Sequence, residues 1–464
     1  MKVFDMDNYD NEEDAEFLGN GGDDDDDEED EDDDDDGNDE DAEDKDGEDA
    51  KMFTSVKGLT LKEDGAKDPY VTLDDSVDDA EELEEMMIAK SDNLILCAKT
   101  EDDISHVEIY LYEGEEDNLF VHHDIMLPSF PLSLEWLNYD VHNKGQGKGS
   151  FVAIGTFDPE IEIWDLDTID VSYPSLILGG NSNPTEALGT GKKKRRSKKP
   201  SDLYHVDAVM CLAWNKLHPS LLASGSADTT IKLWDLGSST PEVAIRSFNN
   251  HKNKVQGLAW NPTEGQVLLS GGYDKQAHIF DTRTPTSVLS FKLTADVECL
   301  KWDPLHPERF VVSTEDGVVK CFDGRQPTSP IFTIHAHDGA VSGLDISSLV
   351  DGLIVTGSSD KATKIWNTKD TTAIKCLASK DLQVGKVYSA SFSPDDDLIV
   401  GVAGSNGNLV VWNLDGNASV RRAVKGADAG PSKRKEVTVI QDDGGEDDDF
   451  AEGGEGDDGM EEDE

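Results

Sequence analysis

The chain has 464 residues, with 41 Lys and Arg against 100 Asp and Glu, and a formal net charge of −59. This charge argues against nonspecific binding of bare nucleic acid by the whole chain, since phosphates would be repelled. No apolar run reaches the roughly 18 residues of a membrane span. The 5 widely spaced cysteines favour a reduced compartment over a disulfide scaffold or a Cys-rich zinc site.

The negative charge is concentrated at the two ends of the chain. Residues 1–50 hold 29 acidic and 2 basic residues, and residues 442–464 hold 14 acidic and no basic residues. Such segments bury too little apolar surface to offset the conformational entropy lost on folding. We therefore expect a disordered acidic tail over 1–67 and another over 426–464, acidic from 442. We also expect residues 68–90 to form a lead-in segment with a short helix.

The body of the chain, 91–425, repeats one short unit. An aromatic residue followed by Asp or Asn ends an alternating strand at 42- to 46-residue separations: Trp234, Phe280, Phe322, Trp366 and Trp412. A second apolar series lies 20 residues earlier every time: Trp214, Trp260, Trp302, Ile346 and Phe392. The constant offset predicts two strands of one sheet, joined by turns of fixed length.

A unit of this size cannot bury both faces of its sheet, but radial stacking into a closed ring does. The sequence therefore predicts an all-β, seven-bladed propeller. Its blades are expected at 91–126, 132–180, 204–248, 251–291, 295–334, 337–377 and 385–424. The first blade lacks a clear innermost strand, which residues 69–73 supply in one interpretation. Six blades is the alternative.

Two segments, 223–235 and 356–367, resemble repeats of the WD40 family. In that family a His, a Ser or Thr, an Asp and the Trp form one hydrogen-bonded network inside a blade. The resemblance implies two full networks here: His205, Ser224, Asp228 and Trp234, and His337, Thr356, Asp360 and Trp366. A third set, His251, Ser270 and Asp274, has Phe280 in place of the Trp.

These recurring His, Ser and Asp sets also fit a hydrolase, but a catalytic triad is needed once and a structural network is needed in each blade. Adjacent His122 and His123 are expected on opposite faces of a strand, where both cannot easily reach one metal ion. No GxSxG, GxxxxGK[ST] or HExxH motif occurs. We predict no enzyme activity, no catalytic or metal site and no cofactor.

A basic run stands out in this acidic chain, inside a loop expected at about 180–203. Seven of the eight residues at 192–199 are cationic: Lys192, Lys193, Lys194, Arg195, Arg196, Lys198 and Lys199. An exposed lysine-rich loop is typical of a nuclear localisation signal. The alternative interpretations of this basic run are an RNA contact and a solvated segment tethered to the protein's own acidic tail. A second cluster, 433–435, has the same ambiguity.

Phe280-Asp281-Thr282-Arg283 and Phe322-Asp323-Gly324-Arg325 resemble the WDxR ending of substrate receptors of cullin ubiquitin ligases. The Trp is missing from both segments. Arg283 and Arg325 are therefore a weak adaptor motif.

Stretches outside the repeats, including 68–73, 92–96, 100–105 and 117–128, resemble a nuclear branch of eukaryotic WD40 proteins. That resemblance implies a non-catalytic scaffold in ribosome biogenesis, in rRNA transcription or precursor processing, with chromatin and histone association. It places the protein in the nucleus and nucleolus. Expected partners are preribosomal factors, histones or other basic proteins, with nucleic acid contacted only indirectly and no membrane.

Three hypotheses follow, each for a monomer within larger complexes. The first is this nuclear assembly factor. The second is a histone chaperone or chromatin reader that acts through the acidic tails, which attract basic proteins. The third is a ubiquitin-ligase substrate receptor.

Overall fold

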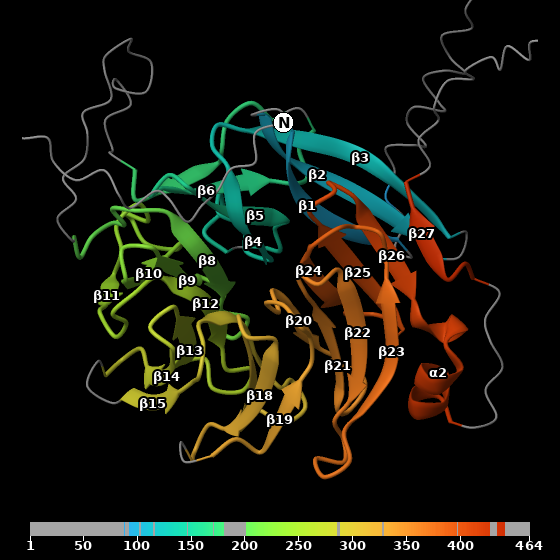
Figure 1. Ribbon diagram of the computed structural model, residues 1–464. Helices are drawn as coiled ribbons and strands as arrows, with labels where there is room; N and C mark the ends of the chain where they lie inside the picture. The colour runs from blue at the N-terminus through green and yellow to red at the C-terminus, as the bar shows by residue number, and fades with distance from the viewer. Residues whose placement is uncertain are drawn as a thin grey trace, which may run out of the picture. The chain divides into compact units, whose positions relative to one another are not determined.

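The structure is a computed structural model that describes Ile88 and residues 92–440, except 102–103, 115–116, 146, 170, 181–200, 285–287, 327–328, 397 and 427–433. These residues form seven antiparallel sheets, arranged as the blades of a β-propeller (Figure 1). The all-β, seven-bladed prediction is thereby confirmed. The expected tail 1–67, the lead-in segment 68–90 apart from Ile88, the acidic residues 442–464 and the basic run 192–199 lie outside the described residues.

The sheets follow one another along the chain. Blade 1 contains β1 (Asn93–Glu101), β2 (Ile104–Glu113) and β3 (Asn118–Leu127). Blade 2 contains β4 (Pro131–Leu137), β5 (Phe151–Thr156), β6 (Ile161–Asp165) and β7 (Leu176–Leu178). Blade 3 contains β8 (Val209–Trp214), β9 (Leu221–Ser226), β10 (Ile231–Asp235) and β11 (Arg246–Phe248). Blade 4 contains β12 (Val255–Trp260), β13 (Val267–Gly272), β14 (Gln276–Asp281) and β15 (Val288–Lys292).

The remaining three blades have four strands each. Blade 5 contains β16 (Val297–Trp302), β17 (Arg309–Thr314), β18 (Val318–Asp323) and β19 (Phe332–His335). Blade 6 contains β20 (Gly343–Ile346), β21 (Leu353–Gly357), β22 (Ala362–Asn367) and β23 (Lys375–Asp381). Blade 7 contains β24 (Val387–Phe392), β25 (Ile399–Gly404), β26 (Leu409–Asn413) and β27 (Val437–Val439). Between β26 and β27 lie η3 (Leu414–Gly416) and α2 (Ala418–Val424).

The two aromatic series mark two strands of each blade. Strands β4, β8, β12, β16, β20 and β24 contact one another in succession and form the inner wall of the ring. Trp260 ends β12 and donates its indole N–H to the carbonyl of Ala213, in the preceding blade, at 3.0 Å. Trp302 ends β16 and repeats this hydrogen bond to Ala259 at 3.1 Å. Trp214 instead donates to the carbonyl of Pro219 in its own blade at 2.8 Å. Trp260 and Trp302 are therefore the members of the inner series that tie neighbouring blades together in this way.

Apolar side chains fill the space between blades. Seven buried clusters occur among the described residues, one at each junction of neighbouring blades, including that of blade 7 with blade 1. The last junction contains Tyr110 and Tyr112 of β2 beside Val411 of β26. Lys435 also donates its backbone N–H to the Asp117 carboxylate at 2.7 Å, joining the approach to β27 with the start of β3. These contacts close the ring.

The propeller ends later in the chain than residue 425, where the sequence analysis placed its end. The Asn417 side chain accepts hydrogen bonds from the backbone N–H groups of Ser419 and Val420, which starts helix α2 where the last strand of blade 7 was expected. That strand is β27, in which Val439 pairs with Val410. The chain therefore completes the blade after the helix, inside the segment expected to be a tail.

Blade 1 has three strands among the described residues. In the other blades the last strand is outermost, and the chain then passes to the innermost strand of the next blade. Strand β3 leads directly to β4, so β3 is outermost and β1 is the second strand from the centre. The innermost position is therefore the one that residues 69–73 were expected to supply, and those residues lie outside the described part.

Substitution of Phe310 would test the packing between blades 4 and 5. Its ring is fully buried and lies 4.9 Å from Phe291, 5.4 Å from Phe322 and 5.7 Å from Trp302, between ring centroids. We expect Phe310→Ala to lower the free energy of unfolding by about 3–5 kcal/mol, measured by urea denaturation. Phe157→Ala, at a ring that is 58% exposed, is the control and should cost less than about 1 kcal/mol. Equal losses would contradict this account of the core.

Candidate functional site

The His205 network lies entirely inside blade 3. His205 and Trp234 are fully buried. His205 Nδ1 lies 3.0 Å from an Asp228 carboxylate oxygen, and Nε2 lies 2.7 Å from Ser224 Oγ. The Trp234 indole donates to the same Ser224 oxygen at 2.8 Å. Because a carboxylate only accepts, Nδ1–H donates to Asp228, and Nε2 accepts from the Ser224 hydroxyl.

Blade 6 repeats this arrangement with Thr in place of Ser. His337 Nδ1 lies 2.9 Å from Asp360, and Nε2 lies 2.8 Å from Thr356 Oγ1. Trp366 donates to that Thr356 oxygen at 2.9 Å. Burial lowers the pKa of His337 and outweighs the attraction of the Asp360 charge, so the imidazole is neutral.

The recurrence of this network explains its role. Burial opposes ionisation of Asp228, but hydrogen bonds from His205 and Thr230 hold its pKa well below the ordinary value. Ser224 is fully buried and hydrogen-bonded on both sides, so its hydroxyl has no access to a substrate. The network joins the loop before the innermost strand, the turn between the second and third strands, and the Trp-bearing third strand.

Blade 4 brings three potential metal ligands together: His251, Asp274 and His278, with ligand atoms within 4.8 Å of one another. His251 is already engaged on both nitrogens, by Asp274 at 3.0 Å and Ser270 at 2.8 Å. The network of blades 3 and 6 is therefore present here, with Phe280 in place of the Trp. A metal ion would have to displace a hydrogen bond that the other blades use for structure.

His278 takes the place of a lysine. In blades 3 and 6 the residue two positions before the Trp is Lys232 or Lys364, whose ammonium donates to a backbone carbonyl of the preceding loop at 2.6 or 2.7 Å. His278 is hydrogen-bonded through Nδ1 to Ser290 Oγ at 2.9 Å, while its Nε2 is buried without a hydrogen-bond partner among the described residues, and its ring lies 4.6 Å from that of His251 between centroids. Its ring thus supports the same loop, and we assign it a structural role.

The rings of His122 and His123 meet, which corrects the expectation that they point to opposite faces. Strand β3 has a bulge opposite Ile109 and Tyr110, and His122 is the residue left without a register partner. The extra residue turns its side chain toward its neighbour, and the two Nδ1 atoms lie 2.8 Å apart. Among the described residues, this pair gains no third side chain suited to binding a metal.

The basic residues divide between two parts of the chain. Lys192, Lys193, Lys194, Arg195, Arg196, Lys198 and Lys199 lie outside the described residues. In the second cluster, Arg434 forms an ion pair with Asp396 at 2.8 Å, and the Lys435 backbone bonds Asp117. Arg434 and Lys435 therefore take part in the structure of blade 7 and its junction with blade 1.

Arg283 and Arg325 lie in equivalent places, just after β14 and β18. Arg283 binds the Asp281 carboxylate through Nε at 3.0 Å and Nη2 at 2.7 Å. Arg325 binds Asp323 in the same way at 2.9 and 2.8 Å. Both side chains are about 70% exposed, at 69% and 70%. Each arginine is thus paired with the Asp two residues before it, and the motif repeats as a local turn structure.

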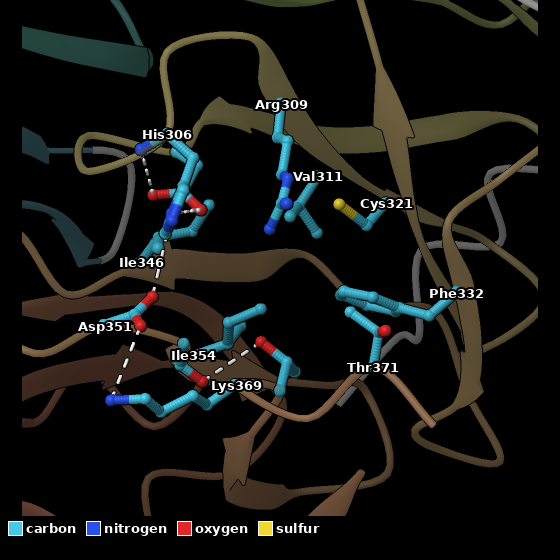
Figure 2. Close-up of a pocket in the computed structure, with 13 residues that line it drawn as sticks. His306, Arg309, Val311, Cys321, Phe332, Ile346, Asp351, Ile354, Lys369 and Thr371 are labelled. Atoms are coloured by element: carbon cyan, nitrogen blue, oxygen red, sulfur yellow. Dashed lines mark hydrogen bonds and ion pairs between the residues drawn. The ribbon is translucent and has the colours of Figure 1, made fainter. Parts of the chain in front are cut away.

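A pocket of about 220 Å³ lies between blades 5 and 6, and the sequence analysis did not anticipate it. One wall includes the polar side chains of His306 and Asp351 (Figure 2), with Asp303 hydrogen-bonded to His306. The apolar part of the lining includes Phe332 of β19, which lies across the pocket from Asp351, and Ile354 of β21, which lies beside Asp351 and Lys369. The site thus combines the two kinds of surface that a specific peptide or ligand pocket needs.

The polar wall is held in place by hydrogen bonds. The Asp303 carboxylate accepts the backbone N–H groups of Leu305 and His306 at 2.9 and 3.1 Å, and lies 3.2 Å from His306 Nδ1. The same nitrogen lies 3.7 Å from Asp351, which also forms an ion pair with Lys369 at 3.6 Å. These contacts join the loop after β16 to the loops flanking β21 and β22.

Two other groups define the interior of the pocket. The Arg309 side chain, at the start of β17, extends into it with its guanidinium toward the centre (Figure 2). Burial raises the pKa of the Cys321 thiol to about 12, so this wall is neutral at physiological pH. Arg309 therefore faces the interior beside the neutral Cys321, across from a polar wall that carries Asp351 and Lys369.

Comparisons with known proteins extend these observations. The family model described as WD domain, G-beta repeat matches residues 200–235, 328–367 and 374–413. A model of the anaphase-promoting complex subunit 4 WD40 domain matches residues 243–304. In solved structures, the chain resembles a chain of the mitotic checkpoint complex, with a TM-score of 0.51 and 20% identity over 67% of this chain and 87% of that one. The structural likeness concerns the fold alone.

Curated relatives match nearly the whole chain. An uncharacterized WD repeat-containing protein of Schizosaccharomyces pombe is 42% identical over 448 residues, covering 96% of this chain and 80% of its own. Periodic tryptophan protein 1 of Saccharomyces cerevisiae is 33% identical, over 92% of this chain and 77% of its own. Its Drosophila melanogaster homolog is 30% identical, over 74% and 72%.

The histidines of blade 4 predict a pH dependence of stability. Burial and the neighbouring His251 lower the pKa of His278 from 6.5 to about 4. The unfolded chain therefore binds a proton more readily than the folded protein, and stability falls as the pH drops from 6.5 to 4. We expect His278→Lys, which restores the residue type of blades 3 and 6, to reduce this fall in urea denaturation measured at each pH. His306→Lys, at the polar wall of the pocket, is the control, and an unchanged pH profile for His278→Lys would contradict the assignment.

Proposed function

The chain belongs to the periodic tryptophan protein 1 family of WD40-repeat proteins, and on this basis we propose that it is a scaffold for ribosome biogenesis in the nucleus and nucleolus. The observation that carries the proposal is similarity along nearly the whole chain rather than over the repeats alone. Any propeller has blades, whereas the shared stretches outside them distinguish one branch of WD40 proteins from another. The proposed role is rRNA transcription or precursor processing, without catalysis.

The physical basis of scaffolding is a rigid ring with exposed loops. Short strands hold the loops in fixed positions, so that several partners dock at once. Among the described residues, no helix is long and apolar enough to cross a membrane. The acidic segments, with 29 acidic residues in 1–50 and 14 in 442–464, attract basic proteins such as histones or ribosomal proteins through long-range electrostatics. Such binding weakens as salt is added.

The chromatin reader is the second candidate, since the same acidic segments also suit histones. This candidate is also supported by a partial match to histone acetyltransferase type B subunit 2 of Candida glabrata, which is 24% identical over 36% of this chain. The name describes that protein, and the match lies within the length of a few blades. For the ubiquitin-ligase receptor, the pairing of Arg283 with Asp281 and of Arg325 with Asp323 has a sufficient structural explanation in the local turns.

The central test is affinity purification of the full chain with and without ribonuclease, followed by identification of the bound proteins. Preribosomal factors should co-purify, and those held through RNA should be lost after ribonuclease treatment. Removing residues 1–50 and 442–464 should leave co-sedimentation with preribosomes if the ring is the scaffold. Loss of preribosomes together with histones would favour the chromatin reader, and recovery of ligase adaptors that depend on Arg283 and Arg325 would favour the third hypothesis.

The localisation signal has its own test. Replacing the seven cations at 192–199 by Ala should leave a fluorescent fusion in the cytoplasm, because an import receptor reads extended basic segments. The cluster at 433–435 offers a control: Arg434→Ala removes a cation that is paired with Asp396, so nuclear accumulation should persist. Fluorescence microscopy measures both, and nuclear accumulation without the seven cations would argue against the signal.

A further inference from the structure

The position of Arg309 in the repeat sets blade 5 apart. It is the first residue of β17, lies 13 residues before Phe322 in the chain, and pairs with Asp323. The equivalent strands of the other four-stranded blades start this register with an apolar residue: Phe151, Leu221, Val267, Leu353 and Ile399. A charged residue at a position that elsewhere packs against apolar neighbours breaks the pattern.

The apolar residues at this position help fill the space between blades. Phe151 and Leu353 belong to the buried clusters at their own blade junctions, and Ile399 to the one that closes the ring. In blade 5 the guanidinium extends into the space instead, and a pocket of about 220 Å³ lies there (Figure 2). The pocket therefore exists where one blade has exchanged an apolar residue for an arginine.

The charges around Arg309 are unevenly paired. Its ion pair within the chain is a 3.9 Å contact between Nε and Glu308, which leaves its two terminal nitrogens without a direct carboxylate partner among the described residues. The adjacent Asp323 carboxylate is held by Arg325. Asp303 and Asp351 are held by backbone N–H groups, His306 and Lys369. A guanidinium presents a planar fork that matches a carboxylate.

We propose that this pocket binds an Asp or Glu side chain from an extended segment of a partner protein, with apolar residues beside the acidic one. Arg309 receives the carboxylate, while Val311, Phe332 and Ile354 contact the apolar neighbours. The inference rests on the proposed scaffold function and gives it one specific partner chemistry. Acidic segments with interspersed apolar residues are the class of ligand.

The surroundings of the pocket extend this surface. Leu305, Ile331 and Leu349 belong to loops at the same end of blades 5 and 6 and are 42%, 36% and 51% exposed. A second hollow of about 270 Å³ shares Asp351 and Lys369 with the pocket and reaches Val424 of α2. An extended segment longer than a single residue thus has apolar and polar contacts on both sides of Lys369.

A protein segment fits this site better than a nucleic acid. Asp303 and Asp351 line the same pocket, and their carboxylates repel a chain of phosphates. A single carboxylate flanked by apolar groups reaches Arg309 without placing further negative charge at that wall. The apolar wall also lacks the cations that follow a phosphate backbone.

Oriented peptide libraries provide the probe for the full-length purified protein. One library carries a fixed central Glu with randomised flanks, and matched libraries carry Gln or Lys at the centre. The wild-type protein should retain the Glu library and select apolar flanks. Individual peptides from that selection should bind roughly 10- to 100-fold more weakly to Arg309→Leu. Because leucine is the residue of blade 3 at this position, this variant should keep its thermal unfolding midpoint.

Two further variants sharpen the result. The Arg309→Glu variant should lose the preference for a central Glu and retain the Lys library instead, because its own charge is reversed. Arg283→Gln, which changes an exposed arginine in blade 4, is the matched control and should retain the Glu library. Equal binding by wild type and Arg309→Leu, or no selection by the wild type, would overturn the proposal. Phe450 is the aromatic residue of the acidic segment 442–464. A selection that emerges only after Phe450→Ala would identify this segment of the chain itself as the occupant of the pocket and would also overturn the proposal.

This assay is independent of ribosome biogenesis. It uses purified protein and synthetic peptides, so a failed selection leaves co-purification with preribosomes intact. Conversely, a successful selection with no preribosomal partner would keep the pocket and refute the proposed cellular role.

Discussion

A small β-sheet cannot bury both of its faces, and the rest of this structure depends on how the blades solve that problem together. Every junction between neighbouring blades holds a cluster of buried apolar side chains, including the one between the last blade and the first. Indole N–H groups of Trp260 and Trp302 add hydrogen bonds to the preceding blade. Because each blade is buried only by its neighbours, the ring must close, and its rigidity comes from closure.

Within a blade, the same constraint makes buried polar groups costly unless they are paired. The His205 network satisfies its members by one chain of hydrogen bonds, and the His337 network repeats it. Blade 4 tolerates two departures, Phe280 for Trp and His278 for Lys, because both nitrogens of His251 keep their hydrogen bonds and the His278 ring packs 4.6 Å from the His251 ring. Departures of this kind are structural variation.

Arg309 is a departure of another kind, since it falls between blades rather than inside one. An arginine there does not complete a network, and the space it fails to fill is the pocket. Equivalent positions in the blades can therefore be compared with one another. Binding is expected where a position changes from apolar to charged and its terminal polar atoms gain no direct partner among the described residues. In the proposed function the acidic ends of the chain attract basic partners nonspecifically, so the two proposed kinds of recognition act on ligands of opposite charge.

Periodicity determined most of the fold from the sequence alone. The offset of 20 residues between Trp214 and Trp234 recurs along the chain. It predicts which strands pair, because turns of fixed length allow a single register. Three features escaped that reasoning. Strand β27 is only three residues long and follows a helix, so it carries no repeat signal. The bulge at His122 and the pocket at Arg309 depend on how strands and blades meet across space, and the linear order of residues does not encode that distance. The type of residue at 309 was visible in the sequence, but only the packing of blade 5 against blade 6 decided that a cavity would accompany it.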